Sequence, residues 1–147
     1  MIKYNFEIFE AEKVDEALLS AMDRLMPQLS NSNGPPKRDA LEEIVTSDSS
    51  VLLLAVYKTK IVGSLTLIIF RIPTGLRAWI EDVVVDEGFR GQGVGEALNK
   101  TAIERARNYG AKTVDLTSRP SREVANRLYS RLGFTQRETN VYRLDIS

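Results

Sequence analysis

The 147-residue sequence contains no cysteine and no histidine. The absence of cysteine excludes disulfides, thiolate nucleophiles and thiolate metal sites. The absence of histidine excludes a Ser-His-Asp triad and nearly every zinc site. We therefore expect no bound metal, and any catalysis must use carboxylates, hydroxyls, lysine, main-chain amides or a bound cosubstrate.

The sequence also lacks an excess of either charge and any long apolar run. Lys plus Arg and Asp plus Glu number 20 each, so no excess positive charge favours nucleic acid or an anionic membrane. No apolar run approaches the roughly 20 residues of a membrane span, and the charged stretch MIKYNFEIFEAE is unlike a signal peptide or an anchor. We expect a cytoplasmic protein that binds neither nucleic acid nor membranes, with one domain over residues 1–147.

Hydrophobic periodicity predicts the order of helices and strands. The first half reads as strand, helix, turn-rich stretch, helix and two strands: Ile2–Phe9, Val14–Leu29, 30–39, Arg38–Thr46, Val51–Tyr57 and Ile61–Ile72. The second half reads as strand, helix, strand, helix and strand: Ala78–Val85, Gly93–Asn108, Lys112–Ser118, Ser121–Leu132 and Asn140–Ile146. KTK predicts a hairpin turn, and Gly63 marks a bulge or a close backbone approach. The pattern is that of a mixed α/β domain.

Three glycines crowd into RGQGVG, residues 90–95, where a strand ends and a helix begins. Glycine weakens a helix, so its use here indicates that something approaches the backbone closely. Free N–H groups and the helix dipole favour a phosphate at this position, and Arg90 adds a charge. The dinucleotide fingerprint fails because Leu98 occupies its third glycine position, and no Lys-Ser or Lys-Thr completes a P-loop. A glycine-rich turn that binds nothing is the alternative.

RGQGVG resembles the R/Q-x-x-G-x-G/A signature of the Gcn5-related N-acetyltransferases (GNAT family). WIEDVVVD resembles the fourth strand of that family and the same strand of glucosamine-6-phosphate N-acetyltransferases, and ANRLYSRLGF resembles its LYxKxGF ending. The resemblance implies an α/β (α+β) GNAT fold: one mixed, mostly antiparallel central sheet flanked by helices, with a splayed cleft between strands four and five.

The resemblance also implies that acetyl-CoA is the cosubstrate. Its pyrophosphate would lie on the signature loop, formed by Arg90, Gly91, Gln92, Gly93, Val94 and Gly95. Its pantetheine would pair with main-chain groups of Val83 and Val85, and an N–H near Val84 would stabilise the thioester oxyanion. A buried strand is the alternative for these valines, and both interpretations can hold together.

The implied reaction moves acetyl directly to a primary amine of a small molecule or a peptide. Tyr129 matches the family's proton donor, with core packing as its alternative role. Glu81 is the candidate base; because strand neighbours face opposite sides, only one of Glu81 and Asp82 should face the cleft, and a water relay stays open. The family's usual cofactor-contacting Asn is Arg122 here, and Asn126, one turn later, is the candidate substitute. A GNAT-fold acyl-CoA sensor without turnover is the alternative function, and homodimer formation, common in the family, stays open.

Overall fold

The computed structural model describes residues 5–30 and 34–147. The first part of the predicted strand Ile2–Phe9 and the middle of the turn-rich stretch 30–39 lie outside the described residues. Two compact units make up the chain, Met1–Leu116 and Thr117–Ser147. The single domain over residues 1–147 stays a prediction.

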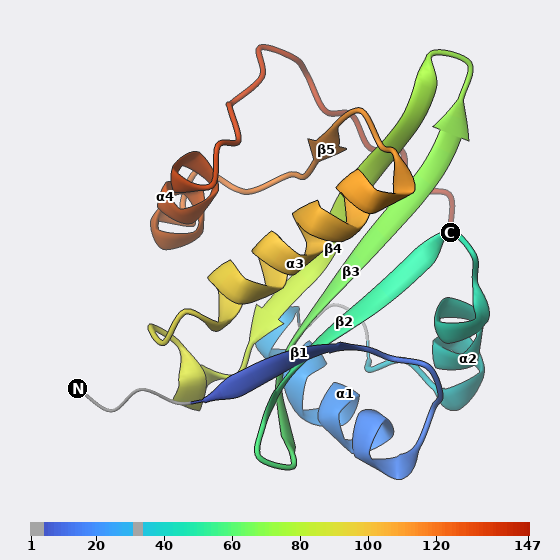
Figure 1. Cartoon of the computed structure of the whole chain (residues 1–147), viewed down its shortest axis with the longest axis vertical. Helices are drawn as coiled ribbons and strands as arrows, with labels where there is room; N and C mark the ends of the chain where they lie inside the picture. The colour runs from blue at the N-terminus through green and yellow to red at the C-terminus, as the bar shows by residue number, and fades with distance from the viewer. Residues whose placement is uncertain (1–4, 31–33) are drawn as a thin grey trace. The chain divides into compact units, whose positions relative to one another are not determined.

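The first unit contains a five-stranded sheet, and its strands follow one another in the order of the sequence (Figure 1). The first three pairings are antiparallel, and the last is parallel. The strands are β1 (Phe6–Glu10), β2 (Ser50–Tyr57), β3 (Lys60–Ile72), β4 (Gly75–Val85) and β5 (Val114–Asp115). The sheet is therefore mixed and mostly antiparallel, as predicted, and KTK forms the predicted hairpin between β2 and β3.

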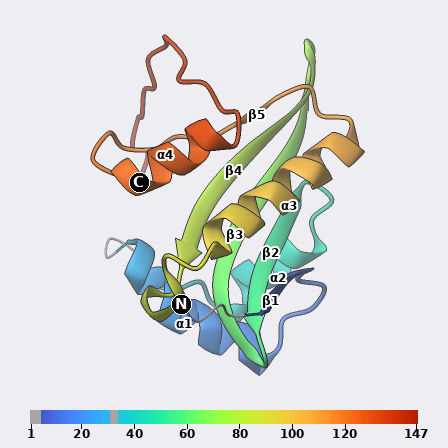
Figure 2. The same ribbon diagram turned by 60° about the vertical axis from the view of Figure 1, so that its left-hand side comes forward.

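Helices cover both faces of this sheet (Figures 1 and 2). The helices are α1 (Glu16–Leu29), α2 (Arg38–Thr46) and α3 (Val94–Tyr109). Leu52 and Leu54 of β2 pack in one core with residues of α1 and α2. Gly63 of β3 faces α3, because a Cβ there would lie 3.0 Å from Val94 Cγ1 and 3.1 Å from Leu98 Cδ1. The pairing of β2 with β3 also shifts register beside Gly63, so the predicted bulge and the predicted close approach are both confirmed.

Local chemistry explains where the longer helices begin and end. The Asp15 carboxylate accepts a hydrogen bond of 2.9 Å from the Leu18 N–H and so caps the start of α1. Gly110 ends α3 in the left-handed region, with φ of 88°, and its N–H donates to carbonyls of the last turn. The stripe of α3 that faces the sheet is buried along its whole length: Val94, Leu98, Ala102 and Ala106.

The pairing between β4 and β5 is short. It joins only Ala78 to Val114 and Trp79 to Asp115, so β5 is much shorter than the predicted strand Lys112–Ser118. Beyond Trp79, the described part of β5 offers β4 no partner. This arrangement fits the predicted splay of the two strands, and it leaves one edge of the C-terminal half of β4 open.

The second unit contains helix α4 (Glu123–Arg131), within the predicted range Ser121–Leu132. The predicted last strand, Asn140–Ile146, is wrong, because this segment has no strand pairing in the structure. Its alternating apolar side chains stay exposed, to 93% at Ile146. Alternation predicts which side chains would share a face, but a strand also needs the hydrogen-bonding edge of a neighbour. Across both units, none of the described helices is long and apolar enough to cross a membrane.

Candidate active site

A β-bulge interrupts β4 beside the candidate base. Thr66 pairs with Glu81 and Ser64 pairs with Val84, so β4 advances three residues where β3 advances two. Asp82 occupies the extra position with φ of 51°, a left-handed conformation that is uncommon outside glycine. The bulge breaks the expected alternation, and Glu81 and Asp82 are both exposed. Strand alternation therefore does not decide which of the two carboxylates faces the cleft, and the choice of Glu81 stays a prediction.

Glu81 lies on the sheet face that α1 and α2 partly cover. Its strand partner Thr66 also pairs with Leu52, which is in the core beneath those helices. One carboxylate oxygen, Oε1, accepts a hydrogen bond of 2.7 Å from the indole Nε1 of Trp79. The indole therefore fixes the orientation of an otherwise exposed carboxylate. Trp79 is not among the site residues predicted from the sequence, although its position two residues before Glu81 on a strand places both side chains on one face.

The main-chain groups of Val85 point away from β3, toward the edge of β4 that β5 leaves unpaired. The Asp86 N–H donates to the Val62 carbonyl at 2.8 Å, which turns Asp86 and, by alternation, Val84 toward β3. Val85 consequently presents its N–H and C=O groups on the other side, where β5 ends early and where its carbonyl accepts from Arg90 Nε at 3.1 Å. Val83 directly follows the bulge at Asp82, and its pairing with a cosubstrate stays a prediction. The Val84 side chain is buried in the core beneath α1. An extended ligand can pair with this edge as a further strand would.

The signature loop owes its shape to glycine. Gly91 and Gly93 have φ of 75° and 86°, and a Cβ at either position would meet no atom within 4 Å. The requirement for glycine here is therefore conformational, and not one of crowding within the chain. Gly93 is the N-cap of α3, and no side chain caps this helix. Gln92 is half-buried in the same loop.

The start of α3 has the properties of an anion site. In a 16-residue helix without a side-chain cap, the first-turn N–H groups and the helix dipole favour a negative group. Val94 and Gly95 contribute main-chain groups there, while the Val94 side chain is buried. Arg90 stands at the end of β4, where its Nε donates to the Val85 carbonyl at 3.1 Å. That contact links the guanidinium of the loop to the open edge of the strand.

The second unit carries the other predicted site residues, Tyr129 and Asn126, on α4. Tyr129 is buried, and its ring meets Phe134 edge-on with the centroids 5.8 Å apart. Burial raises the pKa of the Tyr129 phenol, and the positive charge of Arg122 partly opposes that shift. The phenol is therefore protonated at neutral pH. Asn126 Nδ2 donates to the Arg119 carbonyl at 2.9 Å, which ties α4 to the chain just before it.

A charged cluster at the end of β4 was not predicted from the sequence either. Asp86 is buried and contacts Arg24 and Gln28 of α1. An acidic residue directly after a buried strand, together with two polar residues one turn apart on a helix, was the available signal. Among the residues that the structure describes, no group of three His, Cys, Asp or Glu side chains is placed to hold a metal ion.

Known proteins are similar to this chain in sequence and in architecture. An uncharacterized N-acetyltransferase of Methanocaldococcus jannaschii is 41% identical over 61 residues, which are 42% of this chain and 27% of that protein. A glucosamine 6-phosphate N-acetyltransferase of Trypanosoma brucei brucei is 41% identical over 90 residues, 59% of this chain and 58% of that protein. The matches thus span well under two thirds of each curated relative.

A crystal structure of an acetyltransferase from Trypanosoma brucei superimposes with a TM-score of 0.79 and 28% identity, and the match covers 97% of this chain and 100% of that one. The protein-family model described as "Acetyltransferase (GNAT) family" matches residues 18–134. That match includes β4, the glycine loop, α3 and α4. The chain therefore belongs to the GNAT acetyltransferase family.

Proposed function

We propose that this protein is an acetyl-CoA-dependent N-acetyltransferase. The observation that carries the proposal is the union, within one unit, of the uncapped glycine start of α3 and the open edge of β4, joined by Arg90. The first suits a pyrophosphate and the second suits an extended pantetheine amide chain. Acetyl-CoA has both chemical features in one molecule. Family membership supports the same cosubstrate.

In this proposal Arg90 to Gly95 hold the pyrophosphate, and Val83 and Val85 pair with the pantetheine. The oxyanion donor expected near Val84 is one of the flanking N–H groups on the open edge, since Val84 itself turns toward β3. A main-chain N–H is rigidly held by the sheet. It therefore stabilises the charge that develops on the thioester oxygen without reorganising during the reaction.

Glu81 and Tyr129 have opposite proton tasks in the proposed reaction. Glu81, or a water that it orients, removes the ammonium proton and leaves a free amine. The amine nitrogen then bonds to the thioester carbonyl carbon, the carbon–sulfur bond breaks, and the nitrogen gives its surplus proton to solvent, which leaves the neutral amide. Tyr129 gives its hydroxyl proton to the departing thiolate, and solvent restores it. No covalent enzyme intermediate is needed, which suits a chain without Cys or His.

The acceptor in this proposal is a primary amine of a small molecule or a peptide. The relative named glucosamine 6-phosphate N-acetyltransferase favours a small-molecule amine. The exposed carboxylate of Glu81, on the face beside α1 and α2, gives a cationic amine a place to bind and lose its proton.

Release of free CoA in the presence of a panel of amines tests the proposal. An enzyme releases CoA faster with at least one amine than with acetyl-CoA alone, and the acetylated amine appears in equal amount. A sensor binds acetyl-CoA but shows no amine-dependent release across sugar amines, polyamines and peptide N-termini. Failure to bind acetyl-CoA at all contradicts both functions.

A further inference from the structure

Asp86 lies in the segment that connects β4 to the signature loop and is held by three side chains. It lies between Val85 and the 3-10 turn η1 (Glu87–Phe89) and is only 6% exposed. Its Oδ2 lies 3.2 Å from Arg24 Nε and 3.6 Å from Lys60 Nζ. Its Oδ1 accepts from Gln28 Nε2 at 3.4 Å. If one of these partners moved away, the buried charge of Asp86 would be incompletely paired, which is energetically costly.

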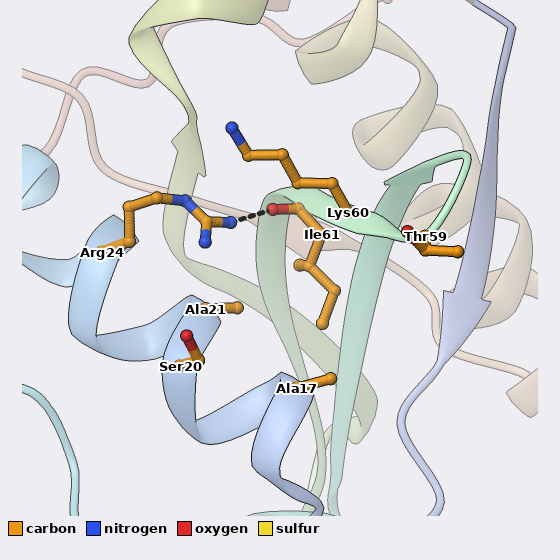
Figure 3. Close-up of a pocket in the computed structure, with 7 residues that line it drawn as sticks. All are labelled: Ala17, Ser20, Ala21, Arg24, Thr59, Lys60 and Ile61. Atoms are coloured by element: carbon orange, nitrogen blue, oxygen red, sulfur yellow. Dashed lines mark hydrogen bonds between the residues drawn. The ribbon is translucent and has the colours of Figure 1, made fainter.

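Gln28 contacts both Asp86 and the residue that follows it, Glu87. While its Nε2 donates to Asp86, its Oε1 accepts from the Glu87 N–H at 2.8 Å. Arg24 likewise makes a second contact, because its guanidinium donates to the Ile61 carbonyl beside a pocket of about 310 Å³ (Figure 3). Arg24 and Gln28, one turn apart on α1, therefore contact the end of β4, the segment that follows it and the start of β3.

The β2–β3 hairpin supports the loop from another side. The rings of Tyr57 and Phe89 lie with centroids 5.5 Å apart, and Lys60 Nζ lies 5.5 Å from the Phe89 centroid. Phe89 directly precedes Arg90. The two supports thus contact Asp86, Glu87 and Phe89, in the segment directly before the predicted pyrophosphate site, although none of these side chains belongs to that site.

We infer that Asp86 is a positioning residue for acetyl-CoA binding, and that it acts by fixing the loop against Arg24 and Gln28 of α1. The inference rests on the proposed function. Binding through main-chain N–H groups depends on where the backbone lies, since those groups have no side-chain freedom to compensate for a shift. A displacement of about 1 Å far from the chemistry is enough to cost roughly 100-fold.

The test compares Asp86→Asn and Gln28→Met with Arg38→Met. Asp86→Asn keeps the shape and removes the charge. Gln28→Met keeps the length and removes the hydrogen bonds to Asp86 and the Glu87 N–H, together with the one to the Arg24 carbonyl within α1. Arg38 is a matched control, because it holds α1 through Glu16 and the Val14 carbonyl at the end of the helix away from the loop. Calorimetry gives the dissociation constant for acetyl-CoA, and urea unfolding confirms that each variant is folded.

We expect the acetyl-CoA dissociation constant to rise roughly 10- to 100-fold in both loop variants and to stay within about twofold in the control. In steady state the KM for acetyl-CoA should rise while the KM for the amine stays constant, a split that mere destabilisation does not produce. Unchanged acetyl-CoA binding in the folded variants overturns the inference while the proposed function stands. If Asp86→Asn does not fold, Gln28→Met decides. A wild-type protein that does not bind acetyl-CoA overturns both.

Discussion

Glu81 is an exposed carboxylate with a fixed orientation, and we expect Glu81→Gln to lower turnover by roughly 100-fold or more at neutral pH, the scale of a lost general base. The glutamine keeps the shape and can still accept from the Trp79 indole. The measurement is kcat and kcat/KM across the pH range with an identified acceptor. Trp79→Phe is the companion variant: it removes only the orienting N–H, so its loss should be smaller. Wild-type rates at every pH in Glu81→Gln would leave Asp82 or water as the base.

Tyr129→Phe separates chemistry from packing, because it removes one hydroxyl and keeps the ring against Phe134. If the phenol protonates the thiolate, single-turnover acetyl transfer should fall about tenfold to a few hundredfold while acetyl-CoA affinity stays nearly constant. The loss is bounded because a thiolate is already a good leaving group. Single-turnover conditions prevent product release from masking the step. An unchanged rate would return Tyr129 to a purely packing role.

The contact between β3 and α3 leaves no room for a side chain at Gly63. A Cβ would lie 3.0 Å from Val94 Cγ1 and 3.3 Å from the Val84 carbonyl oxygen, which belongs to a rigid strand. We expect Gly63→Ala to lower the free energy of unfolding by roughly 1–3 kcal/mol, the usual cost of overpacking. Gly88→Ala is the matched control, because a Cβ there meets nothing within 4 Å. Equal unfolding midpoints in urea for the two variants would contradict the crowding that we describe.

Helices and central strands were predictable because their periodicity comes from burial, and burial shaped the sequence. The range Arg38–Thr46 was predicted as the structure has it, and α3 differs by one residue at each end. The prediction of a strand at Asn140–Ile146 failed because alternation says nothing about the edge to which a strand pairs. The bulge at Asp82 was not predicted for a related reason: a left-handed aspartate leaves no local signature in EDVVV.

The conformation of the signature loop was predictable from its glycines, whereas the contacts that support the loop were not. Gly91 and Gly93 adopt a positive φ, which other residues rarely do. The presence of glycine at these positions therefore indicates this conformation from the sequence. The hydrogen bond from Arg24 to Asp86 joins residues that are 62 positions apart in the sequence. Such a contact depends on how α1 crosses the sheet, which no local pattern encodes.

Stability of the whole molecule should depend on pH through Asp86. Burial pushes the pKa of Asp86 up, but hydrogen bonds from Gln28, Arg24 and the Gly88 main chain, with the charge of Lys60, outweigh it, so the pKa is lowered. A lowered folded-state pKa stabilises the protein above the unfolded value of about 4, and this stability is lost as the pH falls through the folded pKa.

Asp86→Asn should therefore be less stable than the wild type at pH 7 by roughly 1–3 kcal/mol, and the difference should shrink as the pH falls below about 4. Urea unfolding of both proteins at a series of pH values measures it. Glu87→Gln, an exposed neighbour, serves as the control and should show no such trend. A difference between wild type and Asp86→Asn that is the same at pH 3 and pH 7 would contradict the role of the charge.

Binding of acetyl-CoA at the start of α3 is the claim on which the whole account depends. Calorimetric titration of acetyl-CoA into the wild type and into Gly93→Glu tests it most directly. The glutamate obstructs the backbone approach, strains a left-handed position and repels the pyrophosphate. We predict saturable binding by the wild type and no measurable binding by a folded Gly93→Glu protein. Equal affinity in the two proteins would contradict the placement of the cosubstrate on this loop.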